Sequence, residues 1–376
     1  MSFFRIKTKV YFGENALSQL QHIEGKRILI ITDPFMVKSG AINRITSHIE
    51  NKDYEIFDDV VPDPPIEKVV AGVSRMISFK PDTVVALGGG SAIDAAKAIK
   101  DFYMKISKEG SISFIAVPTT SGTGSEVTSF AVITDPEKNV KYPLVSDELL
   151  PDIAILDPSL VVTAPPSITA DTGMDVLTHA IEALVSTKAN DFSDALAEKA
   201  IRLVNEYLLR AYRKGDDIEA REGMHNASCL AGMAFNAVSL GLNHGIAHNI
   251  GGRFHVPHGR TNSILLPYVI EYNAEIHGYS DESCTWAAAR YSKIAGLLGL
   301  PNGRPAIGVR SLINYIRKLQ KEMNLPTHLS ECRVTPEAFA SGKAAVAQGA
   351  LADACTITNP RVPTQQDVIE ILDKVF

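Results

Sequence analysis

Short apolar runs alternate with helical patterns along the N-terminal part of the chain. Arg27–Thr32, Thr83–Leu87 and Ser113–Val117 are rich in β-branched residues and end at turn-forming residues, which is typical of buried strands. Tyr54–Phe57 is a weaker strand candidate, and Ile66–Ser78 has helical spacing. Strands that are separated by helices form a parallel sheet with helices on both faces. The pattern therefore predicts an α/β domain.

The character of the chain changes after Pro165 and Pro166. Long amphipathic helical patterns follow, and strand-like runs nearly disappear. These helical patterns cover Thr172–Leu184, Phe192–Tyr212, Ile218–Asn236, Trp286–Leu298 and Ile307–Met323. A length of 376 residues is enough for two domains. We predict an α/β domain over residues 1–163 and an all-helical domain over residues 164–376.

Composition and charge exclude several classes of protein. The net charge of −6 is unlike the basic surface that nucleic-acid binding needs, and no apolar run is long enough to cross a bilayer. The N-terminal residues lack the apolar core of a secretory signal. The cysteines are scattered and form no CxxC pair; they are Cys229, Cys284, Cys332 and Cys355. These features predict a cytoplasmic protein with reduced thiols and with neither nucleic acid nor a membrane as a partner.

Two small-residue loops follow predicted strands. Gly88–Ser91 stands where a strand meets a helix, so its backbone can approach a phosphate at a helix N-terminus, although a tight turn explains the same residues. Thr119–Ser125 is rich in hydroxyl groups and occupies the same place after a later strand. A doubly wound sheet binds a dinucleotide at the carboxyl ends of its strands. The first domain is therefore predicted to be Rossmann-like and to bind a dinucleotide.

Asp33 ends the first of the buried strands. A carboxylate at that place can accept hydrogen bonds from ribose hydroxyls and repel a 2′-phosphate, which favours NAD over NADP. The pair Asp33-Pro34 is explained equally well as a simple turn.

Histidines gather in the second predicted domain. Residues 241–259 contain four of the ten histidines of the chain, and Asp175 and His179 stand four residues apart, on one face of a helix. Several imidazoles with one carboxylate suit Fe, Zn or Ni rather than Mg or Ca. The candidates for about four ligand positions are Asp175, His179, His244, His248, His255 and His258. A single histidine is usually structural, and the residues alone do not choose among these.

The chain resembles the iron-dependent (group III) alcohol dehydrogenases over essentially its whole length. The motifs that carry the resemblance are Gly88–Lys97, Pro118–Glu126, Gly173–Glu182 and His244–Pro267. The resemblance implies an iron-dependent, NAD(H)-linked alcohol dehydrogenase whose Fe²⁺ is held by Asp175, His179, His244 and His258. The same ligands are compatible with Zn²⁺. His248 matches a further histidine near the nicotinamide and substrate, with a catalytic role, and His255 matches no ligand.

The resemblance also implies the residues that contact NAD(H). Asp33 would lie at the adenine ribose, and Thr128 and Lys141 would lie closer to the nicotinamide ribose. The residues implied at or near the pyrophosphate are Gly88, Gly89, Gly90, Ser91, Thr119, Thr120 and Thr123.

Within the family, the chain is similar to the 1-propanol dehydrogenases of bacterial propanediol utilisation. The segments are Thr172–His179, Asp191–Lys199, Met224–Ser228, Leu230–Phe235, Ala350–Asp353 and Thr358–Arg361. The similarity implies reversible reduction of propanal to 1-propanol with NADH. It also implies a homo-oligomer, a dimer or larger, and an association with the enzymes of a bacterial microcompartment.

Three alternatives remain open at this point. The substrate could be another small alcohol or aldehyde of the same family, such as ethanol, lactaldehyde with 1,2-propanediol, or 1,3-propanediol. A lyase similar to dehydroquinate synthase shares the two-domain plan, but it should carry clustered basic residues for a phosphorylated acidic substrate. The segment around the histidines has mainly Arg253 and Arg260. A non-catalytic assembly component has no reason to keep the implied metal ligands together.

Overall fold

The computed structural model describes residues 4–107, 110–136, 140–276 and 284–376. The chain forms two compact units. The α/β unit comprises Met1–Ala164 with Asp216–Gly232, and the helical unit comprises Pro165–Gly215 with Met233–Phe376. The prediction that residues 1–163 form the cofactor-binding domain concerns function as well as structure, and it stays a prediction.

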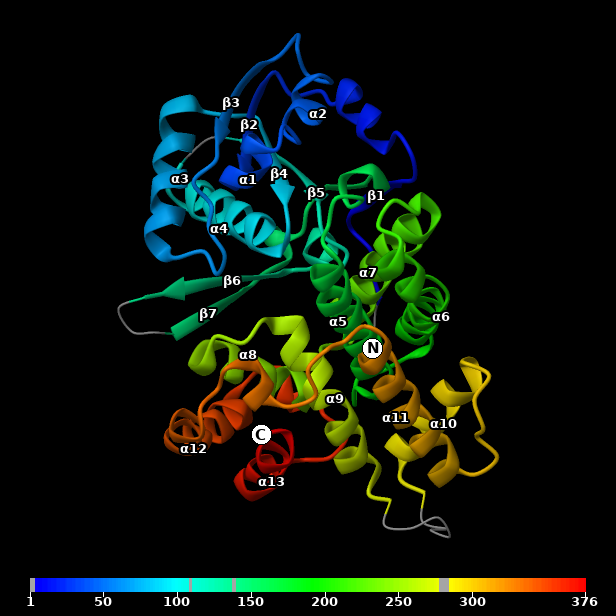
Figure 1. Ribbon diagram of the computed structural model, residues 1–376. Helices are drawn as coiled ribbons and strands as arrows, with labels where there is room; N and C mark the ends of the chain where they lie inside the picture. The colour runs from blue at the N-terminus through cyan, green and yellow to red at the C-terminus, as the bar shows by residue number, and fades with distance from the viewer. Residues whose placement is uncertain (1–3, 108–109, 137–139, 277–283) are drawn as a thin grey trace. The chain divides into compact units, whose positions relative to one another are not determined.

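The α/β unit is built on a parallel sheet of six strands (Figure 1). In spatial order the strands are β1 (Lys9–Phe12), β8 (Ile153–Leu156), β5 (Ser113–Pro118), β4 (Thr83–Gly88), β2 (Arg27–Thr32) and β3 (Asp53–Phe57). The predicted strands at residues 27–32, 54–57, 83–87 and 113–117 are therefore observed as neighbours in one sheet. Their carboxyl ends share one edge, because all the pairings are parallel.

Alternate residues of the central strands enter two different cores. Leu29, Val84 and Phe114 pack with α3 (Ile66–Phe79) and α4 (Gly90–Ile106) on one face. On the other face, residues such as Ile30, Val85 and Ile115 pack against the short helices of residues 16–22, 34–38 and 43–46. Both faces of the sheet are thus covered, which explains why its strands appear as continuous apolar runs. The predicted α/β architecture is confirmed.

A separate antiparallel pair, β6 (Phe130–Asp135) with β7 (Val140–Val145), was not predicted. Nor were the four-residue strands β1 and β8. Such short strands carry too few residues for a recognisable period, and β7 contains Pro143, which weakens a strand pattern.

The helical unit contains no strand among the residues that the structure describes. Its helices are α5 (Pro166–Val185), α6 (Asp191–Arg213), α8 (Leu242–Phe254), α9 (His258–Ala274), α10 (Trp286–Leu297), α11 (Pro305–Glu322), α12 (Pro336–Ala352) and α13 (Gln365–Val375). α7 (Ile218–Val238) begins in the α/β unit and ends in the helical unit. None of the described helices has both the length and the hydrophobicity of a membrane-spanning segment.

α5 is the central helix of this unit. Every residue from Gly173 to Val185 is buried, and α5 packs against both α6 and α9. A helix that is buried all round normally carries apolar residues on all sides. α5 instead carries Asp175, His179 and Glu182, and buried charges of this kind need partners or a metal ion.

α8 runs through a pair of glycines, Gly251 and Gly252. The helix continues to Phe254 and ends at His255, which has a left-handed backbone with φ of 56°. α9 then begins at His258. Cooperative helix formation within a packed unit outweighs the low helix propensity of two glycines.

Candidate metal centre and nucleotide loops

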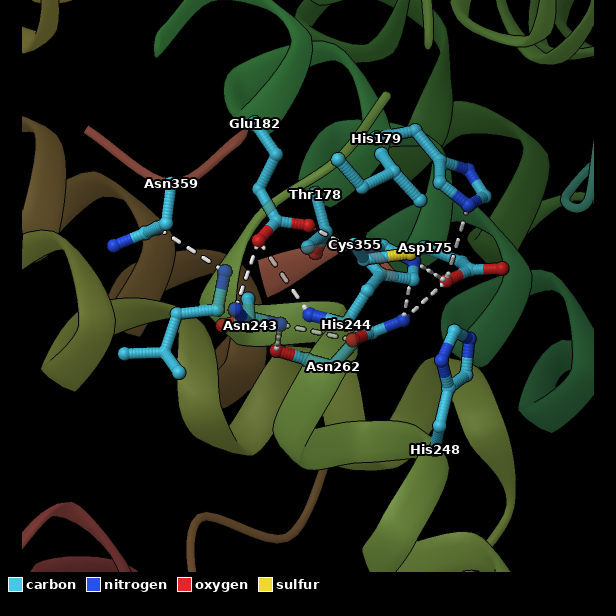
Figure 2. A network of polar contacts seen from close by, with 12 residues as sticks. Asp175, Thr178, His179, Glu182, Asn243, His244, His248, Asn262, Cys355 and Asn359 are labelled. Atoms are coloured by element: carbon cyan, nitrogen blue, oxygen red, sulfur yellow. Dashed lines mark hydrogen bonds and ion pairs between the residues drawn. The ribbon is translucent and has the colours of Figure 1, made fainter. Parts of the chain in front are cut away.

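Four side chains from three helices converge in the helical unit. α5 contributes Asp175 and His179, α8 contributes His244, and α9 contributes His258. One ligand atom from each lies within 4.8 Å of the others. We call this set the metal-ligand group. Figure 2 shows His179, His244 and Asp175 directed toward one another.

The spacing of the metal-ligand group fits a single ion. Asp175 Oδ1 lies 3.6 Å from His258 Nε2, 3.7 Å from His244 Nε2 and 4.0 Å from His179 Nε2. Two atoms that bind one ion at about 2.1 Å lie about 3 to 4.2 Å apart, depending on the angle between them. Imidazole nitrogen and carboxylate oxygen are ordinary ligands of first-row divalent metals.

Burial divides the metal-ligand group into a closed and an open side. Asp175, His179 and His244 are almost completely buried, whereas the side chain of His258 is 40% exposed. Burial alone would raise the pKa of Asp175, but the neighbouring His179 and His258 and a hydrogen bond with His244 hold it well below its usual range. Asp175 is therefore a carboxylate at neutral pH.

Glu182 orients one of the imidazoles. Its Oε2 contacts Nδ1 of His244, so that nitrogen carries the proton and Nε2 faces Asp175. Burial lowers the pKa of His244, but the carboxylates of Glu182 and Asp175 together outweigh burial and raise it to about 9. Glu182 was not singled out from the sequence, although it stands on the same face of α5 as Asp175 and His179.

The other two candidate histidines lie outside the metal-ligand group. His248 is 37% exposed, its Nδ1 is 2.9 Å from Oδ2 of Asp353, and its ring stacks on that of His258 with centroids 5.3 Å apart. His255 is exposed at the end of α8. Asp353 is 105 residues from His248, and no local pattern in the sequence indicated this contact.

The two predicted nucleotide loops meet in the α/β unit. Gly88–Ser91 joins β4 to α4, and Thr119–Ser125 follows β5, the neighbour of β4. Thr119 donates its N–H to the carbonyl of Gly88 at 2.9 Å. A Cβ added to Gly90 would lie 2.7 Å from Cγ2 of Thr123, so the second loop packs directly on the first. The N-terminus of α4, which favours anions, lies in this pair of loops.

Asp33 takes part both in a turn and at this edge of the sheet. Its Oδ1 accepts hydrogen bonds from the N–H groups of Phe35 and Met36 and caps a short helix. Its Oδ2 lies near the first nucleotide loop, 3.3 Å from where a Cβ on Gly88 would stand. The turn and the ribose contact are therefore compatible, because each uses a different oxygen.

Two other implied cofactor residues are placed differently. Thr128 is buried, and its carbonyl and hydroxyl lie 2.8 and 3.2 Å from Nζ of Lys97. Lys141 has its backbone in β7, but its side chain lies outside what the structure describes. The sequence analysis named Lys97 only as the last residue of a motif and gave it no role. A lysine between apolar residues of a helix could have indicated a buried amine.

His225 is buried on α7. Its Nδ1 lies 2.9 Å from Oγ of Ser121, in the second nucleotide loop. Burial lowers the pKa of His225 to about 4. His225 is therefore a neutral support of this loop at physiological pH.

Replacing Gly88 by alanine should weaken both the fold and nucleotide binding. Gly88 has φ of 149°, and a Cβ there would stand 2.6 Å from Cβ of Ala92. We expect a loss of about 1–3 kcal/mol in the stability of the α/β unit, with weaker NADH binding. Thermal unfolding and NADH fluorescence titration measure the two effects. Gly110→Ala is the control, because its Cβ would meet nothing within 4 Å; equal effects of the two substitutions would contradict the argument.

Replacing Glu126 by glutamine should remove a pH dependence of stability. Glu126 is buried, and burial raises its pKa from 4.5 to about 7. Between these pH values the unfolded chain has released the proton that the folded chain retains, so stability falls as pH rises. The free energy of unfolding of Glu126→Gln, relative to that of the wild type, should therefore rise by about 3 kcal/mol between pH 4.5 and 7. Denaturant unfolding across that window tests this, and a constant difference would refute it.

Comparison with known proteins gives full-length matches. The family model "Fe-containing alcohol dehydrogenase family, C-terminal" matches residues 169–376, and the model "Iron-containing alcohol dehydrogenase" matches residues 7–158. The 1-propanol dehydrogenase PduQ of Citrobacter freundii is 46% identical over 377 residues, with 100% of both chains covered. The NADPH-dependent butanol dehydrogenase of Clostridium saccharobutylicum is 39% identical, with 99% of this chain and 97% of that one covered. A crystal structure of 1,3-propanediol oxidoreductase superimposes with a TM-score of 0.91 at 33% identity, covering 100% of both chains.

Proposed function

Because the chain belongs to the iron-containing alcohol dehydrogenase family, we propose that it reduces propanal to 1-propanol with NADH, in a reversible reaction. The observation that carries this proposal is the metal-ligand group, which places three imidazoles and one carboxylate around one point. The full-length similarity to a 1-propanol dehydrogenase supports the choice of aldehyde.

The metal is proposed to be Fe²⁺, held by Asp175, His179, His244 and His258. When bound, the ion supplies Lewis-acid polarisation of the carbonyl oxygen of the aldehyde. Asp175 contributes the single negative charge of the ligand set, so a divalent ion keeps a net charge of +1 there. Glu182 holds His244 with Nε2 toward the ion. The exposed side of His258 leaves the group open to a small substrate.

His248 is proposed as the group that moves the proton. It lies beside His258, partly exposed, so it has a route to solvent. Asp353 holds its Nδ1, which leaves Nε2 as the nitrogen that can donate to or accept from the substrate oxygen.

NAD(H) is proposed to bind to the two loops of the α/β unit. Gly88, Gly89, Gly90 and Ser91 would hold the pyrophosphate with the N-terminus of α4, and Thr119, Thr120 and Thr123 would lie beside them. Asp33 would bind the adenine ribose and disfavour a 2′-phosphate. Thr128 and Lys141 are proposed near the nicotinamide ribose. Because one relative is named for NADPH, the rates with NADH and with NADPH should be compared directly.

The test is NADH oxidation with protein that has been stripped by a chelator and refilled anaerobically with Fe²⁺ or Zn²⁺. The panel is propanal, acetaldehyde, lactaldehyde and 3-hydroxypropanal. We expect metal-restored turnover with the highest kcat/KM for propanal. The preference should be modest, about 10- to 200-fold, because a pocket discriminates a methyl or hydroxyl group only weakly. If another aldehyde gave the higher kcat/KM, that aldehyde and its alcohol would replace propanal and 1-propanol as the proposed substrates.

The lyase alternative is disfavoured by the charges near the metal-ligand group. Arg260 forms an ion pair with Asp171 at 3.0 Å, which neutralises it, and Arg253 is exposed at the surface. A phosphorylated acidic substrate would need unpaired cations at this place. Absence of turnover with every aldehyde and either metal would nevertheless reopen that alternative.

Two further parts of the proposal rest on the resemblance alone. We propose that the chain forms a homo-oligomer, a dimer or larger, and that it works with the enzymes of a bacterial microcompartment. Light scattering after size-exclusion chromatography measures the first. Co-purification with intact microcompartments from cells that produce them measures the second.

A further inference from the structure

The side chain of Asn262 lies against the metal-ligand group. Asn262 is completely buried (0% exposed) and follows His258 by one turn of α9. Its Nδ2 lies 2.7 Å from Oδ1 of Asp175, 2.9 Å from Nε2 of His244 and 3.1 Å from Nε2 of His258. One amide nitrogen thus contacts three of the four ligand atoms. Figure 2 shows its contacts with Asp175 and His244.

Asn243 determines which end of this amide faces the ligands. Nδ2 of Asn243 lies 2.8 Å from Oδ1 of Asn262 and 3.3 Å from its main-chain oxygen. An amide nitrogen can donate to both oxygens, whereas an amide oxygen in its place could donate to neither. Oδ1 of Asn262 is therefore held by Asn243, and its NH₂ group is turned toward Asp175. Asn262 is a donor here, not a ligand.

Asn243 is itself fixed by the carboxylate that orients His244. Glu182 accepts the backbone N–H of Asn243 through Oε1 at 2.8 Å and contacts Nδ1 of His244 through Oε2. A continuous chain of contacts therefore runs from Glu182 through Asn243 and Asn262 to Asp175. At one end of this chain Glu182 contacts His244, and at the other end Asn262 contacts Asp175.

This arrangement suits a ligand carboxylate. Oδ1 of Asp175 has two lone pairs, so it can accept an N–H and still bind an ion. A neutral donor orients the carboxylate without adding a second charge to the buried site. Contacts of this kind around metal ligands fix their direction, and their loss ordinarily weakens metal binding.

We propose that Asn262, held in its orientation by Asn243, is a positioning residue that fixes Oδ1 of Asp175 for the metal and so sets the affinity of the site. This inference rests on the proposed function only in its premise that the metal-ligand group binds a divalent ion.

The test is metal affinity, measured without substrate. Zn²⁺ and Co²⁺ are titrated into chelator-stripped protein in competition with a chromophoric chelator. We expect Asn262→Ala to raise the dissociation constant about 10- to 100-fold. The visible absorption of bound Co²⁺ should also change, because the position of one ligand is no longer fixed. A merely structural role would not alter that spectrum.

A double-mutant cycle tests the role of Asn243. Asn243→Ala should weaken binding in the same direction but less than Asn262→Ala. Because Asn243 acts through Asn262, the double variant should bind no more weakly than Asn262→Ala alone. Asn243→Ala also retains Asn262 and every ligand, so it tests the proposal even if Asn262→Ala does not fold. Multiplicative losses in the double variant would overturn the proposed order of action.

Asn273 provides a matched control. It is also buried on α9 and pairs with another asparagine, donating to Oδ1 of Asn359 at 3.2 Å and accepting from it at 2.8 Å, but it contacts no metal ligand. Asn273→Ala should leave the dissociation constant within twofold of the wild type. An equal loss in this control, or no loss in Asn262→Ala, would overturn the inference alone. A wild type that binds no ion would overturn the proposed function as well.

Discussion

Replacing His258 by alanine is expected to remove the bound metal and aldehyde reduction together, with activity lowered at least about 10³-fold. His258 provides the only member of the metal-ligand group on α9, and its Nε2 lies 3.6 Å from Oδ1 of Asp175. Without it only three of the four ligands would remain to hold an ion, and the partly exposed side of the group would be left to water. Metal content by mass spectrometry and the rate of NADH oxidation measure the two losses.

His255→Ala is the matched control for this experiment. His255 lies three residues before His258, but it is exposed and lies outside the metal-ligand group. We expect this variant to retain full metal content and full turnover. The assignment of ligands would be wrong if His258→Ala kept its metal and its rate, or if His255→Ala lost both.

Local features of the fold could be predicted because their signals are local. A run such as Thr83–Leu87 is buried on both faces of the sheet, so every position after Thr83 is apolar and the strand is recognisable within five residues. Long amphipathic helices such as α6 and α11 repeat apolar residues at helical spacing over several turns, so they are recognisable too. The two loops that are predicted to bind the nucleotide stand out in the sequence because each follows such a strand.

Local sequence patterns limited the metal ligands to six candidate residues, but they did not show which of the six bind the metal. Spacing in the sequence placed Asp175 with His179 and left four downstream histidines equivalent. The distinction between His244 and His255 depends on where α8 ends, and that end depends on packing in the helical unit. Only the resemblance to a family chose between them, and the structure brings the same four side chains together.

The sequence analysis missed the residues that support the ligands for two reasons. Some of these residues make only long-range contacts, and others lie on helices that were not predicted. Asn262 stands four residues after His258, a spacing that would have placed both on one helix face. Since α9 was not predicted, that spacing carried no meaning. Asp353 meets His248 only through the packing of distant segments, so no window of the sequence contains the signal.

Replacing Lys97 by methionine is expected to destabilise the α/β unit by about 3–5 kcal/mol. Lys97 is 1% exposed, and its Nζ lies 2.9 Å from Oγ of Ser125, 2.8 Å from the carbonyl of Thr128 and 2.6 Å from that of Phe130. Burial lowers the pKa of Lys97 to about 8, with Asp94 and Glu126 opposing that effect, so the amine is still mostly protonated at neutral pH. Methionine keeps the apolar stem but provides no donor.

The loss arises from the groups that Lys97 leaves behind. The carbonyls of Thr128 and Phe130 lose this donor, and Asp94 loses the positive charge that opposes its own. Asp94 accepts hydrogen bonds from Ser125 at 2.6 Å and from the N–H of Val132 at 3.0 Å, so its own position is coupled to the same loop. The segment from Ser125 to Val132 should therefore loosen as a unit. Because Ser125 ends the second nucleotide loop, NADH should also bind more weakly.

Lys100→Met separates this effect from the loss of a lysine in general. Lys100 lies on the same helix, and its Nζ donates a long hydrogen bond of 3.3 Å to the carbonyl of Glu148. We expect Lys100→Met to lower stability by less than about 1 kcal/mol, since a partly exposed amine can be replaced by water. Calorimetric unfolding at pH 7 compares the two variants, and NADH titration follows the loop. If both variants unfolded at the same temperature, the buried amine of Lys97 would not be what holds this segment in place.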